Sequence, residues 1–415
     1  VNYSGVPTDG LIISKNKFGQ RTFFSDHWPN RAHQWLVCID HPSDKATVEF
    51  TVKAPVQYQV VSNGTQVEET NLNNKYKLTR WQQNVAIPVK VMCLGVSEFA
   101  MSYAGNVDNI PVYTWVFPAD REKGFTDYSE ALDVLPFFIK NIGPYPFKQL
   151  SDIQSKTIFG GMENAGAIFY SEKSVSGNKR AGQLIAHEIA HQWFGNMVTE
   201  ADWPHLWLSE GFATYMELMY VDYKYGRDTL NRELKDNREK VIAFSKDYYK
   251  PVVDTTLKDY MKLLNANSYE KGGWVLHMLR RQIGDSLFWK GLRKYYTDYT
   301  GKNVVTDDFR KVMEEVSGRD LKIFFKQWIY TAGHPVLSID HKYDVAAKSL
   351  KVTITQQQAV LFEFPITVQI IGSGDDTITK SLRIKDKQTE FSIPLNAAPL
   401  KLIPDPNCNL LFERK

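Results

Sequence analysis

Two histidines and two glutamates near the middle of the chain have the types and spacing that can bind a metal ion and act on water. The segment 187–191 reads H-E-x-x-H, and on a helix residues four apart share one face, so both imidazoles can bind one ion. Glu210 follows nineteen residues after His191. Two histidines and a carboxylate leave a fourth position open for water, as in catalytic zinc sites. The pattern therefore predicts one Zn²⁺ per chain, bound by His187, His191 and Glu210.

Glu188 is expected to be a general base rather than a metal ligand. It follows His187 by one residue, which turns it about 100° around the helix toward the open side of the ion. From there it can accept a proton from zinc-bound water and pass it to a leaving amine. The surrounding helix is largely apolar, which argues against a pair of ordinary surface histidines. Glu217, two turns after Glu210, either orients a metal ligand or is a solvated glutamate.

Length and composition predict a multidomain globular protein. A chain of 415 residues is too long for one core, and 43% hydrophobic with 23% charged residues is ordinary for folded domains. A net charge of +3 gives no support for nucleic acid or an anionic membrane as a partner, and no apolar run is long enough to span a membrane. The three separated cysteines are interpreted as buried thiols. We expect a soluble protein, either cytoplasmic or exported after loss of a signal peptide, of unknown oligomeric state.

Hydrophobic periodicity divides the chain into three regions and predicts a multidomain α+β fold. Residues 1–106 have the alternation of a β domain, with strands expected at 46–52, 58–61, 76–81 and 89–94. Residues 107–332 begin with a strand at 111–116 and continue as helices, which we expect at 126–142 (kinked at Pro136), 181–194, 208–225, 230–244, 269–283, 287–297, 306–317 and 320–330. Residues 333–415 return to a period of two, which predicts a small β-sandwich with strands at 350–355, 364–371 and 388–393.

Two further segments, taken with the metal motif, resemble a known family. Residues 160–166 read GGMENAG, which resembles the G-x-M-E-N signature, and residues 269–273 read YEKGG, which resembles the Y-x-K-G signature. These motifs and the H-E-x-x-H to Glu210 spacing occur in the family order. The chain thus resembles the gluzincin zinc aminopeptidases, the peptidase family M-one that includes aminopeptidase N and the leukotriene-hydrolase aminopeptidase.

This resemblance implies roles for residues that periodicity alone does not single out. Glu163 would bind the free α-amino group of a peptide, because a carboxylate is the natural partner of an ammonium group. Tyr269 would donate a hydrogen bond to the oxyanion of the tetrahedral intermediate. The rest of the G-x-M-E-N segment would contact an extended substrate, namely Gly160, Gly161, Met162 and Asn164. The implied fold is an N-terminal β domain, a thermolysin-like, mainly α catalytic domain and a C-terminal β-sandwich.

The sequence departs from the family pattern in several places. The 106 residues before the catalytic region are few for the family's N-terminal domain, so upstream strands are expected to be missing. The helical domain that usually follows the sandwich is also expected to be absent, which would leave a more open cleft or one closed by a partner chain. Asp26 is a weak candidate for the second amine-binding residue that relatives carry. Ser209 stands where the family often has Asn, a change that should be tolerated.

The leading hypothesis is a zinc-dependent aminopeptidase that removes the first residue from peptides with a free α-amino group. A thermolysin-type endopeptidase or an epoxide hydrolase would keep the same metal site. The acid at Glu163 argues against an endopeptidase, and nothing in the sequence singles out epoxide hydrolysis. A binding protein that retains only the fold would be expected to have lost ligands or base, whereas all of them are present here.

Overall fold

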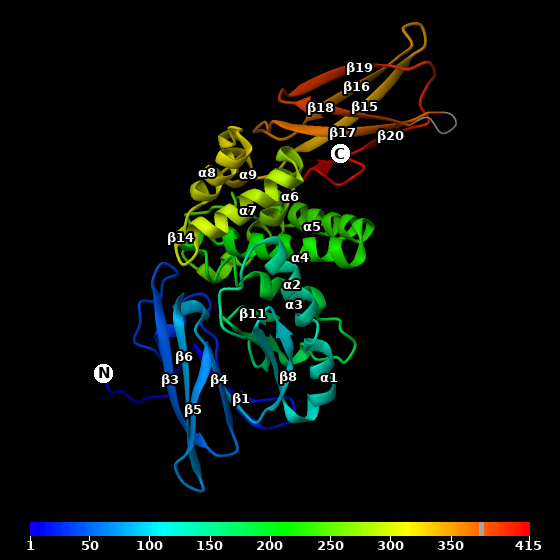
Figure 1. The fold of residues 1–415 in the computed structure, drawn as a ribbon. Helices are drawn as coiled ribbons and strands as arrows, with labels where there is room; N and C mark the ends of the chain where they lie inside the picture. The colour runs from blue at the N-terminus through cyan, green and yellow to red at the C-terminus, as the bar shows by residue number, and fades with distance from the viewer. Residues whose placement is uncertain (373–376) are drawn as a thin grey trace.

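The computed structural model describes residues 1–372 and 377–415, which form a β-rich N-terminal region, a mainly helical centre and a β-rich C-terminal region (Figure 1). This order agrees with the predicted fold class. No helix among the described residues has the length and apolar character needed to cross a membrane. The domain boundaries after residues 106 and 332 stay predictions.

The N-terminal region contains two antiparallel sheets, with strand orders β1-β2-β7-β4 and β3-β6-β5. The strands are β1 (Leu11–Lys15), β2 (Arg21–Ser25), β3 (Lys45–Pro55), β4 (Gln59–Ser62), β5 (Thr65–Asn71), β6 (Tyr76–Pro88) and β7 (Leu94–Ser97). Strands β3, β4 and β6 confirm three of the four strands predicted here. The fourth, at 89–94, is wrong: Val89–Val91 forms a buried 3₁₀ turn after Pro88, and within it Lys90 forms an ion pair with Glu200 of the central region.

A five-stranded sheet begins the central region, in the order β11-β12-β10-β9-β8. Its strands are β8 (Ala100–Val107), β9 (Ile110–Val116), β10 (Leu150–Ser155), β11 (Gly161–Met162) and β12 (Ala167–Ser171). Strand β9 confirms the strand predicted at 111–116. Strand β10 is parallel to both of its neighbours and buried along its whole length. Strand β11 lies at the edge of the sheet, so the G-x-M-E-N segment can pack against the helices that follow it in the chain.

Helices make up most of the centre; the first of them lies beside the sheet, and most of the others lie between the sheet and the C-terminal strands (Figure 1). They are α1 (Arg121–Tyr128), α2 (Ala131–Asn141), α3 (Gly182–Ala190), α4 (Trp207–Tyr225), α5 (Arg227–Asp247), α6 (Gly272–Ile283), α7 (Asp285–Tyr299), α8 (Thr306–Ser317) and α9 (Lys322–Ile329). Two short strands, β13 (Thr199–Glu200) and β14 (Asn303–Val304), pair in parallel beside them. Most predicted helices are confirmed with shifted ends, and α8 has the predicted limits.

The prediction of a single kinked helix at 126–142 is wrong, because the structure has two helices there. The break comes after Tyr128, and Pro136 lies inside α2. At the break, the carboxylate of Glu130 is buried and forms ion pairs with Lys224 and Lys179. We attribute the turn to these two partners, which lie far away in sequence, rather than to the proline.

Close contact between helices brings the site elements together. Helix α4 packs against α3 on one side and α6 on the other, and its residues are buried over most of its length. Gly211 lies against Gly272 at the start of α6, where an added Cβ would lie 2.8 Å from the Gly272 Cα. Only glycine permits this approach of two backbones. The residue before Gly211 is Glu210, so the contact fixes it relative to the segment that contains Tyr269.

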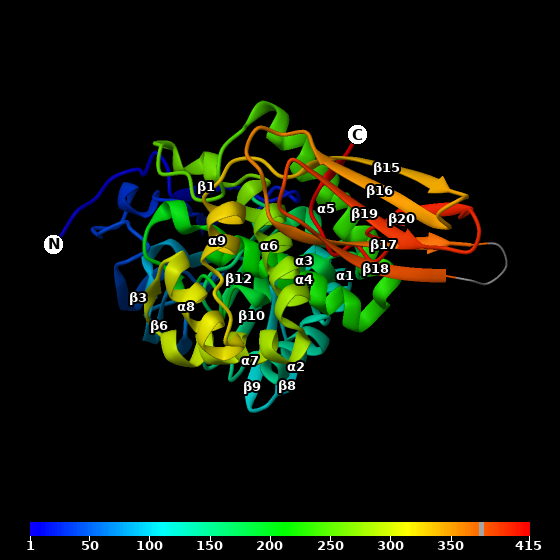
Figure 2. The same cartoon turned by 90° about the horizontal axis from the view of Figure 1, so that it is seen from above.

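The C-terminal region has two sheets, in the orders β19-β16-β15-β21 and β18-β17-β20 (Figure 2). The strands are β15 (Val336–Asp344), β16 (Ser349–Gln356), β17 (Phe364–Ile371), β18 (Thr377–Ile384), β19 (Gln388–Pro394), β20 (Lys401–Pro404) and β21 (Glu413–Arg414). The three strands predicted here are confirmed as β16, β17 and β19. Alternate residues of β16 and β17 are buried, as the period of two indicated.

Candidate metal centre and cleft

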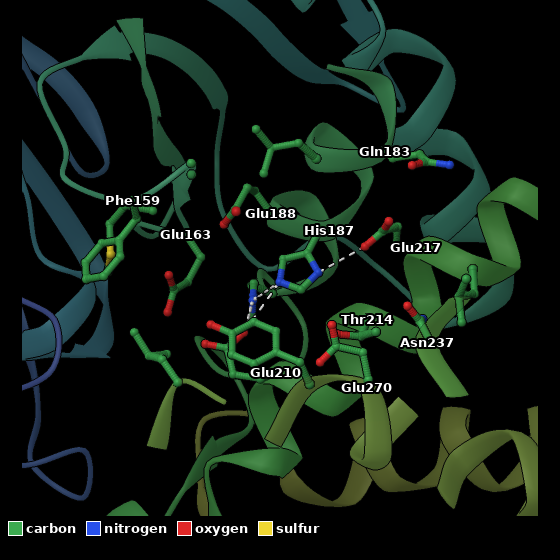
Figure 3. Close-up of a pocket in the computed structure, with 18 of the residues that line it drawn as sticks. Phe159, Glu163, Gln183, His187, Glu188, Glu210, Thr214, Glu217, Asn237 and Glu270 are labelled. Carbon is green, nitrogen blue, oxygen red and sulfur yellow. Dashed lines mark hydrogen bonds and ion pairs between the residues drawn. The ribbon is translucent and has the colours of Figure 1, made fainter. Parts of the chain in front are cut away.

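A cleft of about 680 Å³ lies where α3, α4 and the G-x-M-E-N segment meet (Figure 3). Every predicted site residue lines it except Asn164, which is buried. The predicted site residues that line the cleft are Gly160, Gly161, Met162, Glu163, His187, Glu188, His191, Glu210 and Tyr269. The chain thus brings together groups that are up to about 110 positions apart in sequence.

Three side-chain atoms converge in the cleft as the ligands of one metal ion would. The Nε2 atoms of His187 and His191 lie 3.1 Å apart, and the Glu210 Oε2 atom lies 3.4 Å from the first and 3.2 Å from the second. Ligands about 2.0–2.1 Å from a tetrahedral ion lie about 3.4 Å from one another. The geometry of the three groups therefore fits a metal ion such as zinc.

The electrostatics of the cluster favour positive charge. Burial alone would lower the pKa of both histidines, yet the carboxylate of Glu210 raises both pKa values, with Glu217 also acting on His187. Burial alone would raise the pKa of Glu210, but the two imidazoles hold it well below its ordinary range. A cation placed among these groups replaces the protons that the imidazoles would otherwise bind.

Both imidazoles are oriented through their second ring nitrogen. His187 Nδ1 lies 3.3 Å from a carboxylate oxygen of Glu217, and His191 Nδ1 lies 3.1 Å from the carbonyl oxygen of Phe194 and 3.1 Å from the hydroxyl of Ser209. A proton on Nδ1 leaves Nε2 free to bind a metal ion. Of the two alternatives for Glu217, the distance favours the orienting acid over the solvated one.

Glu188 lies on the side of α3 that faces β11. Its carboxylate lies against the backbone of Gly161, where a Cβ atom would come 2.2 Å from the nearest carboxylate oxygen. The sequence predicts that Gly161 contacts substrate. The structure adds that a glycine at this position leaves room for the Glu188 carboxylate. Burial raises the pKa of Glu188 to about 7, against the lowering effect of the nearby imidazoles. A carboxyl group with this pKa can both accept and donate a proton near neutral pH.

Tyr269 lies in a π-helical turn, Asn267–Lys271, that leads directly into α6. Such turns are rare and often occur at functional sites. The Tyr269 ring is stacked with the His187 ring, with 6.0 Å between centroids and 12° between planes. Burial, helped by the carboxylates of Glu210 and Glu163, raises the pKa of Tyr269 well above its ordinary value. The phenol therefore keeps its proton and remains a hydrogen-bond donor.

The backbone of Glu163 is tied to the segment that follows α3. Its carbonyl oxygen accepts hydrogen bonds from the side-chain amides of Gln192, at 3.2 Å, and Asn196, at 2.6 Å. Gln192 also accepts a hydrogen bond from the Gly166 N–H. Neither amide is given a role by the sequence prediction, although Gln192 directly follows the H-E-x-x-H motif and Asn196 comes four residues later. One carboxylate oxygen of Glu163 is buried and has no partner among the described residues.

Comparison with known families gives two matches. The peptidase family M1 domain matches residues 129–328, and the peptidase M1 N-terminal domain matches residues 7–89. The chain belongs to peptidase family M1. The matched ranges together cover more than half of the chain and include every predicted metal ligand.

Relatives within family M1 are much longer than this chain. Aminopeptidase A of Gloydius brevicauda is 31% identical over 360 residues, which cover 81% of this chain and 36% of that protein. Glutamyl aminopeptidase of Rattus norvegicus is 27% identical over 405 residues, covering 92% and 42%. Among solved structures, Legionella pneumophila aminopeptidase A, in complex with aspartic acid, has a TM-score of 0.85 at 20% identity, covering 99% of this chain and 49% of that one. The chain thus spans less than half the length of these relatives.

The prediction of Asp26 as a second amine-binding residue in this M1 chain is wrong. The Asp26 side chain is fully buried and forms an ion pair with Arg31 at 2.5 Å. It also accepts hydrogen bonds from the Ile158 N–H and the Thr157 hydroxyl. Asp26 does not line the cleft, whereas Trp28, two residues later, does. The carboxylate is occupied by structural partners and is not available for a substrate.

Proposed function

We propose that this M1 chain is a zinc-dependent aminopeptidase that hydrolyses the first peptide bond of peptides with a free α-amino group. The observation that carries this proposal is the buried, unpartnered carboxylate oxygen of Glu163, a residue that lines the same cleft as the three metal-binding side chains. A buried anionic oxygen without a partner is costly, and a substrate ammonium group would supply a strong one.

His187, His191 and Glu210 are assigned to hold the zinc ion, on the separations of their ligand atoms and the electrostatic preference for a cation. Bound zinc supplies Lewis acidity toward water and the scissile carbonyl group. Glu217 holds the His187 ring in place, and Phe194 and Ser209 do the same for His191.

Glu188 is assigned to move the proton. Burial raises the pKa of this carboxyl group, which helps it to accept a proton from the attacking water and then donate it to the departing amine. Its place against Gly161 keeps it on the β11 side of the cleft, so it would take the proton of the water from the side that the imidazoles leave open.

Tyr269 is assigned to stabilise the oxyanion. Its raised pKa keeps the hydroxyl protonated, and a neutral donor fixed at this position would gain strength as charge develops on the carbonyl oxygen. The stacking with His187 holds the ring beside the metal-binding groups.

Glu163 is assigned to bind the substrate amine and so to set cleavage at the first peptide bond. With the ammonium group held there, the first peptide bond is the one that reaches Glu188 and Tyr269. Gln192 and Asn196 fix the backbone of Glu163, so the distance from the amine to the reacting bond is set by hydrogen bonds within the chain.

The proposal is tested by digesting one pentapeptide, with its amino end free or acetylated, in the presence and absence of a chelator. Mass spectrometry should show stepwise loss of residues from the free peptide alone, stopped by the chelator and restored by added zinc. Internal cleavage of both peptides would instead indicate an endopeptidase and would remove the role of Glu163. No cleavage of either peptide by the zinc-loaded chain would reject the proposed activity.

A further inference from the structure

The cleft differs in chemistry between its two ends, and the end beside Glu163 is apolar. Phe159 lies there (Figure 3), Met162 precedes Glu163 in the chain, and Trp28 packs against Phe159. Leu264 follows the Tyr260–Leu263 turn, and all four residues line the cleft. Figure 3 shows Phe159 and Glu163 on one side of His187, with Gln183, Glu217 and Asn237 on the opposite side. A peptide held across the cleft therefore meets an apolar surface at one end and a mainly polar one, which also includes Leu218, at the other.

The apolar end is backed by a continuous set of aromatic contacts. The rings of Trp28 and Phe159 meet edge to face at 6.2 Å, and Trp28 meets Trp203 at 5.8 Å. Trp203 in turn stacks on Tyr260 at 5.2 Å, in the turn that leads to Leu264. Trp28 is only 2% exposed. These contacts hold the Trp28 ring in place. Its indole N–H is buried without a partner among the described residues, but it is a neutral donor and supplies no positive charge for a carboxylate side chain.

Among the described residues, no cation lines this end. Of the two cations that line the cleft, Arg180 precedes Gln183 by three residues, and Lys240 pairs at 3.3 Å with Glu270. Figure 3 shows both Gln183 and Glu270 away from Phe159. Two further cations lie behind the wall without lining the cleft. Lys90 is paired with Glu200 and lies 5.9 Å from the Trp203 ring. Arg31 lies 6.0 Å from the Phe159 ring, and its charge is paired with Asp26 and Asp9.

We infer that Trp28, Phe159, Met162 and Leu264 form the pocket for the first side chain of the substrate, and that this pocket selects apolar residues over acidic ones. The inference rests on the proposed function, in which the substrate amine is bound at Glu163. The first side chain leaves the same carbon atom as the amine, so it lies at the Glu163 end, while the departing peptide extends to the polar end. An acidic side chain here would lose its water without gaining a cation, and it would lie near the carboxylate of Glu163.

This selectivity differs from what the names of several relatives describe. Curated relatives are called glutamyl aminopeptidase, and the Legionella protein was solved with aspartic acid. For this chain, two effects favour an apolar first residue: the pocket can bury a leucine-sized side chain, and it offers no partner to a carboxylate. We expect kcat/KM to be at least about tenfold higher for a leucine than for a glutamate first residue.

The test measures kcat/KM of the zinc-loaded full chain on the 4-nitroanilides of leucine, phenylalanine, alanine, glutamate and aspartate. The expected order places leucine or phenylalanine first, with glutamate and aspartate last. Turnover with glutamate or aspartate equal to or faster than leucine would overturn the pocket assignment while leaving the aminopeptidase proposal intact. Turnover of none of the five substrates would instead reject both.

Variants separate the pocket from general effects on activity. Leu264→Ala, which truncates a half-buried side chain, should lower the leucine-to-alanine ratio of kcat/KM by about threefold to tenfold. Leu218→Ala is a control for truncation elsewhere in the cleft, because the buried Leu218 lines it next to Glu217 at the other end, and its ratio should stay within about twofold of wild type. Phe159→Lys, which adds a cation to the pocket, should raise the glutamate-to-leucine ratio by about tenfold or more. Unchanged ratios in both Leu264→Ala and Phe159→Lys would overturn the inference.

Discussion

Replacing Lys90 by methionine should destabilise the protein strongly, although Lys90 lies outside the cleft. The Lys90 and Glu200 side chains are no more than 1% exposed, and they pair across the junction of the N-terminal and central regions. Lys45, which also lies near Glu200, already donates hydrogen bonds to the carbonyl oxygens of Met197 and Lys302. The variant therefore leaves the Glu200 carboxylate buried without its main partner.

The expected loss is about 3–5 kcal/mol, the usual cost of removing one partner from a buried ion pair. The double variant Lys90→Met with Glu200→Leu should lose clearly less than the sum of the two single variants, because no buried charge is left behind. Lys77→Met is the matched control. Lys77 pairs with Glu69, which is 44% exposed and can return to water, so its loss should cost at most about 1 kcal/mol.

The assay is urea unfolding followed by tryptophan fluorescence at several pH values. In Lys90→Met, Glu200 should have a folded pKa above its unfolded value, since burial already raises it in the wild type. The variant is then more stable at low pH, where Glu200 is protonated, and loses stability as pH rises through the folded pKa of Glu200. The difference in free energy of unfolding between wild type and Lys90→Met should therefore be smaller at pH 5 than at pH 8. A deficit below about 1 kcal/mol, or one that does not change with pH, would refute the reasoning.

Four other predictions concern the site and its support. Glu188→Gln should retain one zinc per chain by elemental mass spectrometry while losing at least about 100-fold in kcat, and normal turnover would remove it as the base. Tyr269→Phe should lower kcat more than it raises KM, whereas a change in KM alone would count against the oxyanion role. Glu217→Gln should weaken zinc binding by about tenfold in a chelator competition, and unaltered affinity would make Glu217 a bystander. Burial raises the pKa of Asp152 from 3.8 to about 7, so the stability that its protonated form gives below pH 4 is lost as pH rises through 7. The free energy of unfolding of Asp152→Asn, measured relative to wild type, should therefore be about 1–3 kcal/mol more favourable at pH 8 than at pH 5. A difference that does not change with pH would contradict the assignment.

The sequence predicted best the features that depend on local spacing. The H-E-x-x-H residues lie on α3 and directly after its end, and Glu210 lies on α4, both with strong sequence signals. The candidate metal-binding group could therefore be assembled from residue types and spacing alone. The resemblance to family motifs then brought in Glu163 and Tyr269, which periodicity alone would not have distinguished from other glutamates and tyrosines.

Features that depend on distant partners were missed. Strand β10 contains the polar residues Asp152 and Gln154, which are typical of a loop, yet both are buried. Asp152 accepts a hydrogen bond from the Tyr170 hydroxyl at one carboxylate oxygen, and Gln154 donates one to Asp120. Lys90 has the sequence surroundings of a strand residue, but its partner Glu200, 110 residues away, holds it in a buried turn. The role of Asp26 failed for the same reason, because its partners at 157 and 158 cannot be read from local sequence.

The most direct measurement of the central claim is the ratio of kcat/KM for one peptide with a free amino end to that for its acetylated form, in wild type and in Glu163→Gln. If the unpartnered Glu163 carboxylate binds the substrate amine, the wild-type ratio should exceed about 100, and the variant should reduce it at least tenfold while keeping its zinc. A ratio near 1 in the wild type, or an unchanged large ratio in Glu163→Gln, would contradict the account.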